Sequence, residues 1–230
     1  INNQKILRNS MAHLTKVKIS NNNWDNSDSD LIVVGVYEDK TFSSIAKSIN
    51  EQNGKLFENA IDIGDIKGKK GEFHLFYIEN KRILLMGLGK KEKFNENEAR
   101  LIAGSASRYA IDKKIDNFSI ECFPEQKRFC QAFGEGLVLG SYQFFEYKTK
   151  KDNNKFILQN VSVMGCNSNH ILKGASIGEA VCLARDLGNY PGNVATPSKL
   201  AQVAKEISDE GEMNVKVLDR EEFTEMGMGG

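Results

Sequence analysis

The sequence predicts an α/β protein in which a mixed β-sheet lies between helices and is followed by a linker helix and a truncated second αβ unit. Three observations lead to this fold class. The segment Leu31–Tyr37 is a continuous apolar run, as expected for a strand buried on both faces of a sheet. Strand-like segments alternate along the chain with apolar residues at helical spacing. Phe73–Ile78 and Arg82–Leu88 are joined only by Glu79–Lys81, a connection short enough to require an antiparallel pair.

The other elements of the first half follow from spacing and turn residues. Lys16–Ile19 resembles a strand, and Asn21–Asp30 predicts a solvated turn that lacks the glycine and distal glutamate of a calcium loop. Phe42, Ile45, Ala46 and Ile49 repeat at helical spacing. The stretch 57–70 is polar and glycine-punctuated towards its end, and it predicts a hairpin or mobile loop between strands.

A helix is predicted over 95–110, where Asn95 and Glu98 form a capping-box-like start. One face of this helix consists of small residues that allow close packing on a sheet: Ala99, Ile102, Ala103, Ala106 and Ala110. Phe118–Phe123 and Val161–Gly165 predict two further strands. A long helix over 129–144 and a solvated basic loop at 148–155 lie between them.

The C-terminal part predicts a helix over 175–187, a further helix that opens at Pro197 and continues to Ile207, and a fresh strand at Val215–Leu218. We therefore expect a tail or leader at 1–13, an N-terminal domain at 14–170, a linker helix at 171–189 and the truncated beginning of another domain at 190–230. Met11 is a candidate natural start, and the glycine-rich end of the sequence suggests a fragment.

Composition describes an ordinary globular protein, with 40% hydrophobic and 27% charged residues. Lysine plus arginine and aspartate plus glutamate number 31 each, so no global field favours nucleic acid or an anionic membrane. The four cysteines, Cys122, Cys130, Cys166 and Cys182, contain no C-x-x-C pair and predict buried, reduced thiols rather than a zinc site or disulfides. Without a membrane-length apolar run or a signal peptide, we expect a soluble, cytoplasmic protein.

Several local patterns resemble catalytic or binding motifs. Gly174–Gly178 fits G-x-S-x-G, but a nucleophile elbow needs a preceding strand and a later histidine, so small residues at a helix start explain it better. Gly87–Lys91 lacks the spacing of a phosphate loop and predicts a tight strand exit. The histidines, His13, His74 and His170, are isolated. The lysine clusters at 67–70, 90–91, 113–114 and 148–151 predict solvated loops.

The segment at 184–201 carries a pattern that is specific enough to compare with a known family. Ala184-Arg185-Asp186-Leu187, followed by Asn189-x-Pro191-x-Asn193-x-x-Thr196-Pro197 and Leu200-Ala201, closely resembles the hinge and entry segment of the leucyl aminopeptidases, which are two-metal cytosolic exopeptidases. Weaker similarities occur in the family's order upstream, at 84–90, 100–110 and 135–148, and downstream, at 215–219 and 226–230. The resemblance covers roughly residues 14–230.

The resemblance implies a macro-domain-like N-terminal domain that contributes to hexamer assembly and shapes access to active sites. It implies that the full-length enzyme removes N-terminal residues from peptides with two divalent metal ions, Mn²⁺ or Zn²⁺. The family's metal ligands correspond to sequence beyond Gly230, so no residue here receives a catalytic, cofactor-binding or metal role and no metal is expected on this fragment. The acids Asp219, Glu221, Glu222 and Glu225 are explained by the start and exposed face of a helix.

Two other functions remain open at this point. A stand-alone macro-type module would bind ADP-ribose or a related nucleotide, although no well-formed glycine-rich phosphate loop is present. The lysine loops could contact nucleic acid, which would show as steeply salt-dependent binding. The leading hypothesis is the catalytically inert N-terminal portion of a leucyl aminopeptidase.

Overall fold

The computed structural model describes residues 13–14, 16–123, 127–147, 155–166 and 169–229. By its contacts the chain divides into two compact units, 1–183 and 184–230, which are described separately. Residues 1–12 of the predicted tail or leader at 1–13, and most of the predicted basic loop at 148–155, lie outside the described residues.

The first unit is organised around a six-stranded sheet within the described residues. Its strands are β1 (Lys16–Ile19), β2 (Leu31–Val36), β3 (Phe73–Ile78), β4 (Lys81–Gly87), β5 (Asn117–Glu121) and β6 (Asn160–Met164), arranged in the order β1-β6-β5-β2-β4-β3. Neighbouring strands are parallel except β3, which pairs antiparallel with β4. The predicted mixed sheet and its antiparallel pair are confirmed.

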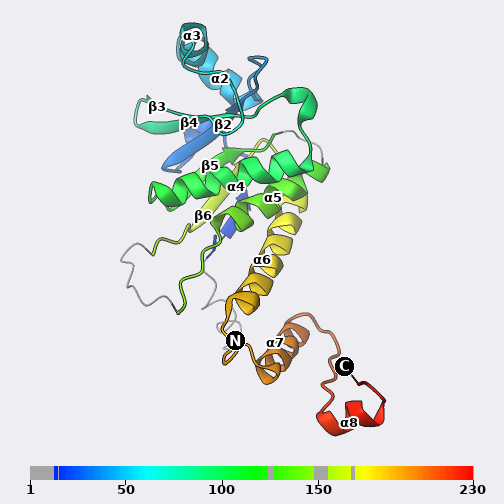
Figure 1. Ribbon diagram of the computed structural model, residues 1–230. Coiled ribbons are helices and arrows are strands. Elements are labelled where there is room, and N and C mark those ends of the chain that lie inside the picture. The colour runs from blue at the N-terminus through cyan, green and yellow to red at the C-terminus, as the bar shows by residue number, and fades with distance from the viewer. Residues whose placement is uncertain (1–12, 15, 124–126, 148–154, 167–168, 230) are drawn as a thin grey trace. The chain divides into compact units, whose positions relative to one another are not determined.

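Strand β2 is buried on both faces, as its apolar run predicts. Leu31 and Val33 join a core with the helices α4 (Glu96–Asp112), α5 (Lys127–Ser141) and α6 (Asn169–Asn189), whereas Ile32 and Val34 join a second core with α2 (Ser44–Gln52) and α3 (Leu56–Ile63). Figure 1 shows α2 and α3 on one side of the sheet and α4 and α5 on the other. Side chains of alternate strand residues therefore fill two separate layers.

Two predicted elements differ from the structure in this unit. The segment predicted as a loop from residue 57 begins as helix α3, whose buried residues Phe57 and Ile61 are one helical turn apart. Because Gly64 at a φ of 97° ends this helix, only the segment after it is a loop. Helix α6 begins at Asn169 rather than near residue 175, so the G-x-S-x-G pattern lies inside a helix.

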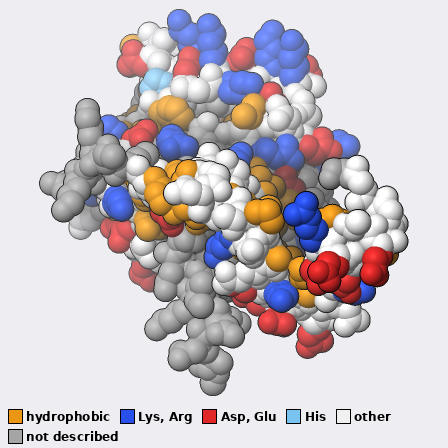
Figure 2. Space-filling view, turned by 60° about the horizontal axis from the view of Figure 1, so that its bottom comes forward, with side chains coloured by type: hydrophobic (Ala, Val, Ile, Leu, Met, Phe, Trp, Pro, Cys, Tyr) orange, Lys and Arg blue, Asp and Glu red, His pale blue; other side chains and the backbone are white. Residues whose placement is uncertain are grey.

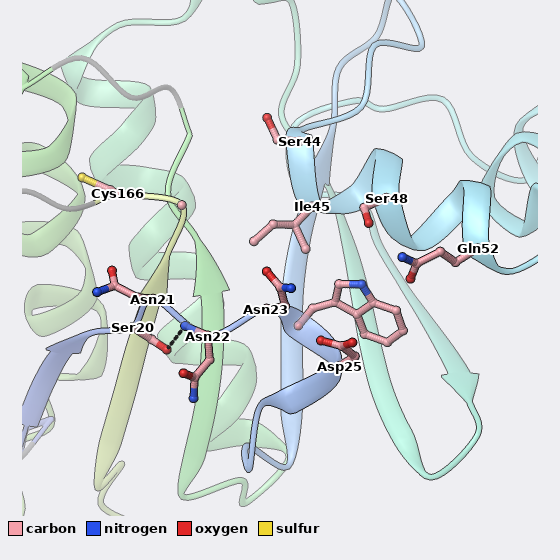
Figure 3. Close-up of a pocket in the computed structure, with 12 residues that line it drawn as sticks. Ser20, Asn21, Asn22, Asn23, Asp25, Ser44, Ile45, Ser48, Gln52 and Cys166 are labelled. Carbon is pink, nitrogen blue, oxygen red and sulfur yellow. Dashed lines mark hydrogen bonds between the residues drawn. The ribbon is translucent and has the colours of Figure 1, made fainter.

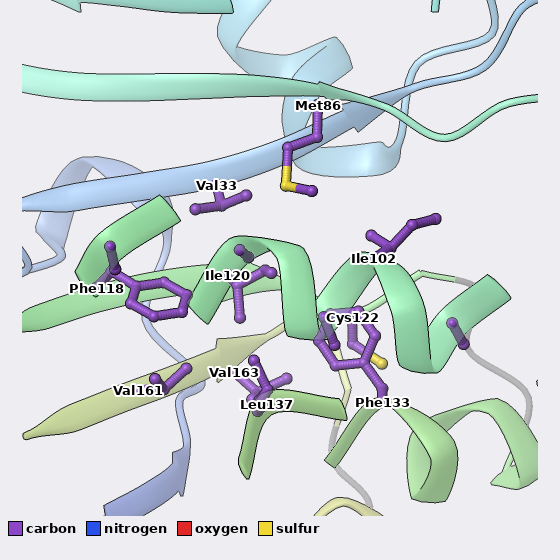
Figure 4. Packing of buried hydrophobic residues seen from close by; sticks show 14 of the residues in the cluster. Val33, Met86, Ile102, Phe118, Ile120, Cys122, Phe133, Leu137, Val161 and Val163 are labelled. Atoms are coloured by element: carbon purple, nitrogen blue, oxygen red, sulfur yellow. The ribbon is translucent and has the colours of Figure 1, made fainter. Parts of the chain in front are cut away.

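Glycines allow three helices of the first unit to pack very closely. A Cβ atom on Gly136 or Gly140 of α5 would overlap the backbone of α4 at Arg100 or Gly104. On its other side, α5 approaches α6 so closely that a Cβ on Gly174 would overlap Gln131. The helix layer is therefore held partly by direct backbone contact, and Phe133 and Leu137 of α5 fill the space beneath it (Figure 4).

The second unit contains α7 (Pro197–Glu210) and α8 (Arg220–Glu225). Thr196 caps α7 by accepting a hydrogen bond from the Lys199 amide, and Pro197 is its first residue, as predicted. The strand predicted at Val215–Leu218 is wrong, because this segment is neither helical nor paired with another strand. An alternating pattern forms a strand only where a neighbouring strand accepts its hydrogen bonds.

Candidate functional site

A cavity of about 490 Å³ lies at the carboxyl ends of β1 and β6 in the first unit. It is lined by a polar turn after β1 (Ser20–Asp25), by one side of α2 and by Gly165 and Cys166 after β6. Figure 3 shows Asn23 and Asp25 facing Ser48 and Gln52 across the hollow. The turn predicted from its polarity therefore forms the wall of a cavity, including a 3-10 turn at Trp24–Asn26.

A buried carboxylate lies at the amino end of α2, next to Ile45, which lines the cavity. Glu121, the last residue of β5, is only 3% exposed, and its carboxylate accepts hydrogen bonds from the Ser43 hydroxyl and, at 2.8 Å, from the Ile45 amide. Ser43 accepts in turn from the Gly35 amide. Burial raises the pKa of Glu121, whereas the hydrogen bonds from Ser43 and the α2 amides act in the opposite direction.

This arrangement makes Glu121 the cap of α2, because Ser43 itself makes no side-chain capping bond to that helix. The amino end of a helix is a common site for a phosphate group. Here a carboxylate already occupies the amides, so a phosphate would meet a like charge. Sequence reasoning missed this role, since a single glutamate at a strand end carries no signal without its partner helix.

The strand exit at Gly87–Lys91 is closely packed, and the amides of Leu88 and Gly89 donate to the carbonyls of Val36 and Gly68. Gly89 has a φ of 77°, and a Cβ atom on Gly87 would overlap the Lys69 carbonyl. A short 3-10 turn at Lys91–Lys93 follows instead of a helix. The segment therefore lacks the helix amino terminus that binds phosphate in nucleotide-binding loops.

Three of the four cysteines converge, which the sequence spacing did not predict. Cys122 follows β5, Cys166 follows β6, and Cys130 lies in α5. The Sγ atom of Cys130 is 3.0 Å from that of Cys166 and 3.9 Å from that of Cys122, and all three lie within 4.8 Å of one another. The absence of a C-x-x-C pair was misleading, because adjacent parallel strands bring their carboxyl ends together regardless of sequence spacing.

No disulfide joins any of the four cysteines in the structure, and Cys182 lies outside the cluster. Cys122 and Cys130 are buried, whereas Cys166 is half-buried and borders the cavity (Figure 3). Contact with the other two sulfur atoms and burial raise the pKa of Cys122. Its thiol therefore stays protonated at neutral pH unless a cation replaces the proton.

The other candidates do not assemble a catalytic group among the described residues. Ser176 of the G-x-S-x-G pattern is exposed on a helix, and the flanking glycines serve helix packing. His74 lies 4.0 Å from the Glu72 carboxylate, and none of the histidines belongs to a group of three potential metal ligands in the part of the chain that the structure describes.

Two acids of the second unit, Asp219 and Glu222, have structural partners. Asp219 accepts from the amides of Glu221 and Glu222, and the Glu222 carboxylate accepts from the Asp219 amide, so the two residues form a capping box for α8. These acids do not fit a pair of divalent ions, which needs several converging carboxylates. In the described parts of the chain, only the thiol cluster gathers three potential ligands.

The basic clusters are interspersed with acids and aromatic rings. Lys70 forms an ion pair of 2.8 Å with Glu98, and Lys91 lies 5.8 Å from the centre of the Tyr37 ring. On the face shown in Figure 2, lysine and arginine side chains are mixed with aspartate and glutamate rather than collected in one stripe. The cluster at 148–151 lies outside the described residues.

The specific segment 184–197 is an ordered connection in the second unit. Its first residues complete α6, and the Tyr190 amide bonds to the Asp186 carbonyl. The amides of Val194 and Ala195 then both donate to the Pro191 carbonyl. The pattern thus encodes the end of one helix, a turn and the cap of the next.

Comparison with known proteins follows the same division of the chain. Residues 33–151 match the cytosol aminopeptidase family, N-terminal domain, and residues 182–230 match the cytosol aminopeptidase family, catalytic domain. A probable cytosol aminopeptidase of Alkaliphilus metalliredigens is 31% identical over 232 residues, which cover 93% of this chain and 46% of that protein. The chain thus spans about half the length of the curated relatives it matches.

Solved structures agree in fold. A mutant of tomato leucine aminopeptidase superposes with a TM-score of 0.74 at 22% identity, covering 95% of this chain and 47% of that one. The bottromycin maturation enzyme BotP in complex with Mn gives a TM-score of 0.66 at 19% identity, covering 86% of this chain and 40% of the other.

Proposed function

This chain belongs to the cytosol aminopeptidase family, and on this basis we propose that it is the N-terminal portion of a metal-dependent aminopeptidase that removes N-terminal residues from peptides. One observation carries the proposal: matches to the N-terminal and catalytic domains of one family follow each other in the family's order along a single chain. The division into a domain at 14–170, a linker helix at 171–189 and a catalytic beginning at 190–230 is part of the proposal.

The 230-residue chain itself is proposed to be catalytically inert. Asp219 and Glu222 of its second unit cap α8, and no three carboxylates converge among the described residues, so the two divalent ions would have to bind residues of the longer protein. Mn²⁺ or Zn²⁺ is the expected metal, and the manganese complex of a structural neighbour supports this choice. No step of the reaction is assigned to a residue of this chain.

The role proposed for this portion is assembly of a homo-hexamer and control of access to its active sites. A cytoplasmic location is supported by the names of the relatives. Among the described residues, no helix combines the length and apolarity needed to cross a membrane. Mixed charge around the lysine clusters argues against nucleic acid as a partner.

The alternative of a stand-alone ADP-ribose module is not supported. The match continues into the catalytic domain, and Glu121 occupies the helix amides that a phosphate would need.

Hydrolysis of leucine p-nitroanilide with added Mn²⁺ tests the proposal. The 230-residue chain should release no nitroaniline, whereas the longer protein that continues past Gly230 should release it and lose this activity with a chelator. Turnover by the short chain would refute its inertness, and an inactive, metal-loaded long protein would refute the aminopeptidase function. Light scattering of the long protein tests the hexamer, and a monomer would contradict the assembly role.

A further inference from the structure

We propose that Cys122, Cys130 and Cys166 form a binding site for one thiophilic d¹⁰ cation, with Zn²⁺ as the expected occupant. This proposal does not depend on the aminopeptidase function, since it rests only on side chains of the first unit. Of the metal ions that proteins bind, Zn²⁺ and Cu⁺ are among those that favour thiolate ligands.

The geometry of the three sulfur atoms fits a common metal ligand set. Zn²⁺ binds thiolates at about 2.3 Å, so tetrahedral coordination places the sulfur atoms about 3.8 Å apart. The Cys122–Cys130 distance is 3.9 Å and the Cys130–Cys166 distance is 3.0 Å, with the third pair also within 4.8 Å. The Cys130–Cys166 distance would have to lengthen by about 0.8 Å to reach the tetrahedral value, and Cys166 is the least buried of the three residues.

The thiols are held on three separate elements of the fold. Cys122 and Cys166 follow β5 and β6, whose register pairs Glu121 with Met164, and Cys130 is near the amino end of α5. Their positions are thus fixed by the sheet and by a helix that packs on it, and a site built on such elements is preorganised. Figure 4 shows Cys122 beside Phe133 of α5, within the core.

Access and charge both favour Zn²⁺. Cys166 borders the 490 Å³ cavity, so an ion can enter there and take a water molecule as its fourth ligand. Three thiolates leave a net charge of about −1 on Zn²⁺ but about −2 on Cu⁺, and a buried site disfavours the larger charge. The amino end of α5, a helix of 15 residues, adds a favourable dipole for this negative charge.

Buried cysteines commonly pack as small apolar residues, and Cys182 shows this alternative in the same chain. It is fully buried and lies outside the cluster, so Cys182→Ser is a matched control for the loss of a buried thiol. Cys130→Ser and Cys166→Ser remove one ligand each. Cys166→Ser is the gentler change because this side chain is already half-buried rather than enclosed.

The experiment uses the tag-free 230-residue chain, reduced, stripped with a chelator, loaded with Zn²⁺ or Cu⁺ and desalted. We expect about one Zn²⁺ per chain by elemental analysis, falling to below about 0.2 in Cys130→Ser and Cys166→Ser and unchanged in Cys182→Ser. Added Zn²⁺ should raise the melting temperature of the wild type and of Cys182→Ser only. Co²⁺ should give a thiolate charge-transfer band in the wild type and in Cys182→Ser, and this band should be largely lost in Cys130→Ser and Cys166→Ser because they no longer retain the ion.

Retention of Cu⁺ but not Zn²⁺, with the same dependence on the two cysteines, would support the site and correct its occupant. Failure of the reduced wild type to retain either ion above the level of Cys166→Ser would overturn the proposal. Equal binding by wild type and Cys130→Ser would overturn it as well. Because the wild-type spectrum with Co²⁺ needs no substitution, the proposal stays testable even if a variant does not fold.

Discussion

Substitution of Gly140 by alanine tests the close packing of the helix layer. In α5 this residue contacts Gly104 of α4 directly, and an added Cβ atom would lie less than 3.0 Å from the Gly104 backbone. A backbone atom cannot rotate aside as a flexible side chain can. The two helices must therefore separate locally by about 1 Å, which loosens the core beneath them.

The magnitude follows from two opposing effects. Overpacking of a core typically costs about 1–3 kcal/mol, and the upper end applies because the obstacle is backbone. Replacing glycine by alanine inside a helix returns about 1 kcal/mol. The net loss of unfolding free energy is about 2 kcal/mol, which corresponds to a fall of about 4–8 °C in the melting temperature of a chain of this size.

Gly104→Ala is the matched control, because a Cβ there would lie 3.3 Å from the Gly136 carbonyl oxygen and needs a shift of only a few tenths of an ångström. Both variants gain the same helix propensity. The difference between their unfolding free energies therefore reports the contact between the Gly140 and Gly104 backbones. Urea unfolding, monitored by circular dichroism, measures this free-energy difference. A Gly140→Ala protein as stable as Gly104→Ala would refute the backbone-contact reasoning.

Three other predictions concern named side chains. Burial and then the Asp39 carboxylate raise the pKa of Tyr37 from 10.0 to about 12, so its contribution to the unfolding free energy is complete below pH 10 and is lost as pH rises through 12. In urea melts, the stability difference between wild type and Tyr37→Phe should fall over that window; a constant difference would contradict the shift. Asn95→Ala removes the cap of α4 and should cost about 1 kcal/mol of unfolding free energy, measured by thermal melting. Arg100→Met removes both guanidinium bonds, of 2.9 and 2.6 Å, to the Glu135 carboxylate and should cost about 2 kcal/mol in the same assay. The double variant with Glu135→Met should recover part of that loss, and an equally unstable double variant would count against the pair.

The sheet was predictable because its signals are local. The unbroken apolar run in β2 predicts a strand buried on both faces, and the short connection between β3 and β4 predicts an antiparallel pair. The structure has both features. Helix α3 was missed because its residues at 57–63 were grouped with the glycine-rich segment after them. The buried pair Phe57 and Ile61 shows the helical spacing that a shorter window would have revealed.

The thiol cluster and the Glu121 cap could not be predicted in the same way. Each depends on which strands are neighbours, and the sequence does not state that β5 lies between β6 and β2. The strand predicted at 215–218 failed for a related reason, because the residues of a segment do not show whether a neighbouring strand is present to pair with it. Local patterns do not show which strands, distant in the sequence, become neighbours in the sheet.

The place of β1 at the edge of the sheet affects how the protein is made. Lys16 pairs with Asn160, so β1 has no partner in the sheet until nearly the whole first unit has been synthesised. At ordinary synthesis rates this wait is on the order of ten seconds. Strands β2, β3 and β4, whose pairings lie within residues 31–87, can meanwhile assemble. The exposed Lys16 and Lys18 alternate along β1. They keep this strand charged, and so less prone to aggregate, until β6 is available to pair with it.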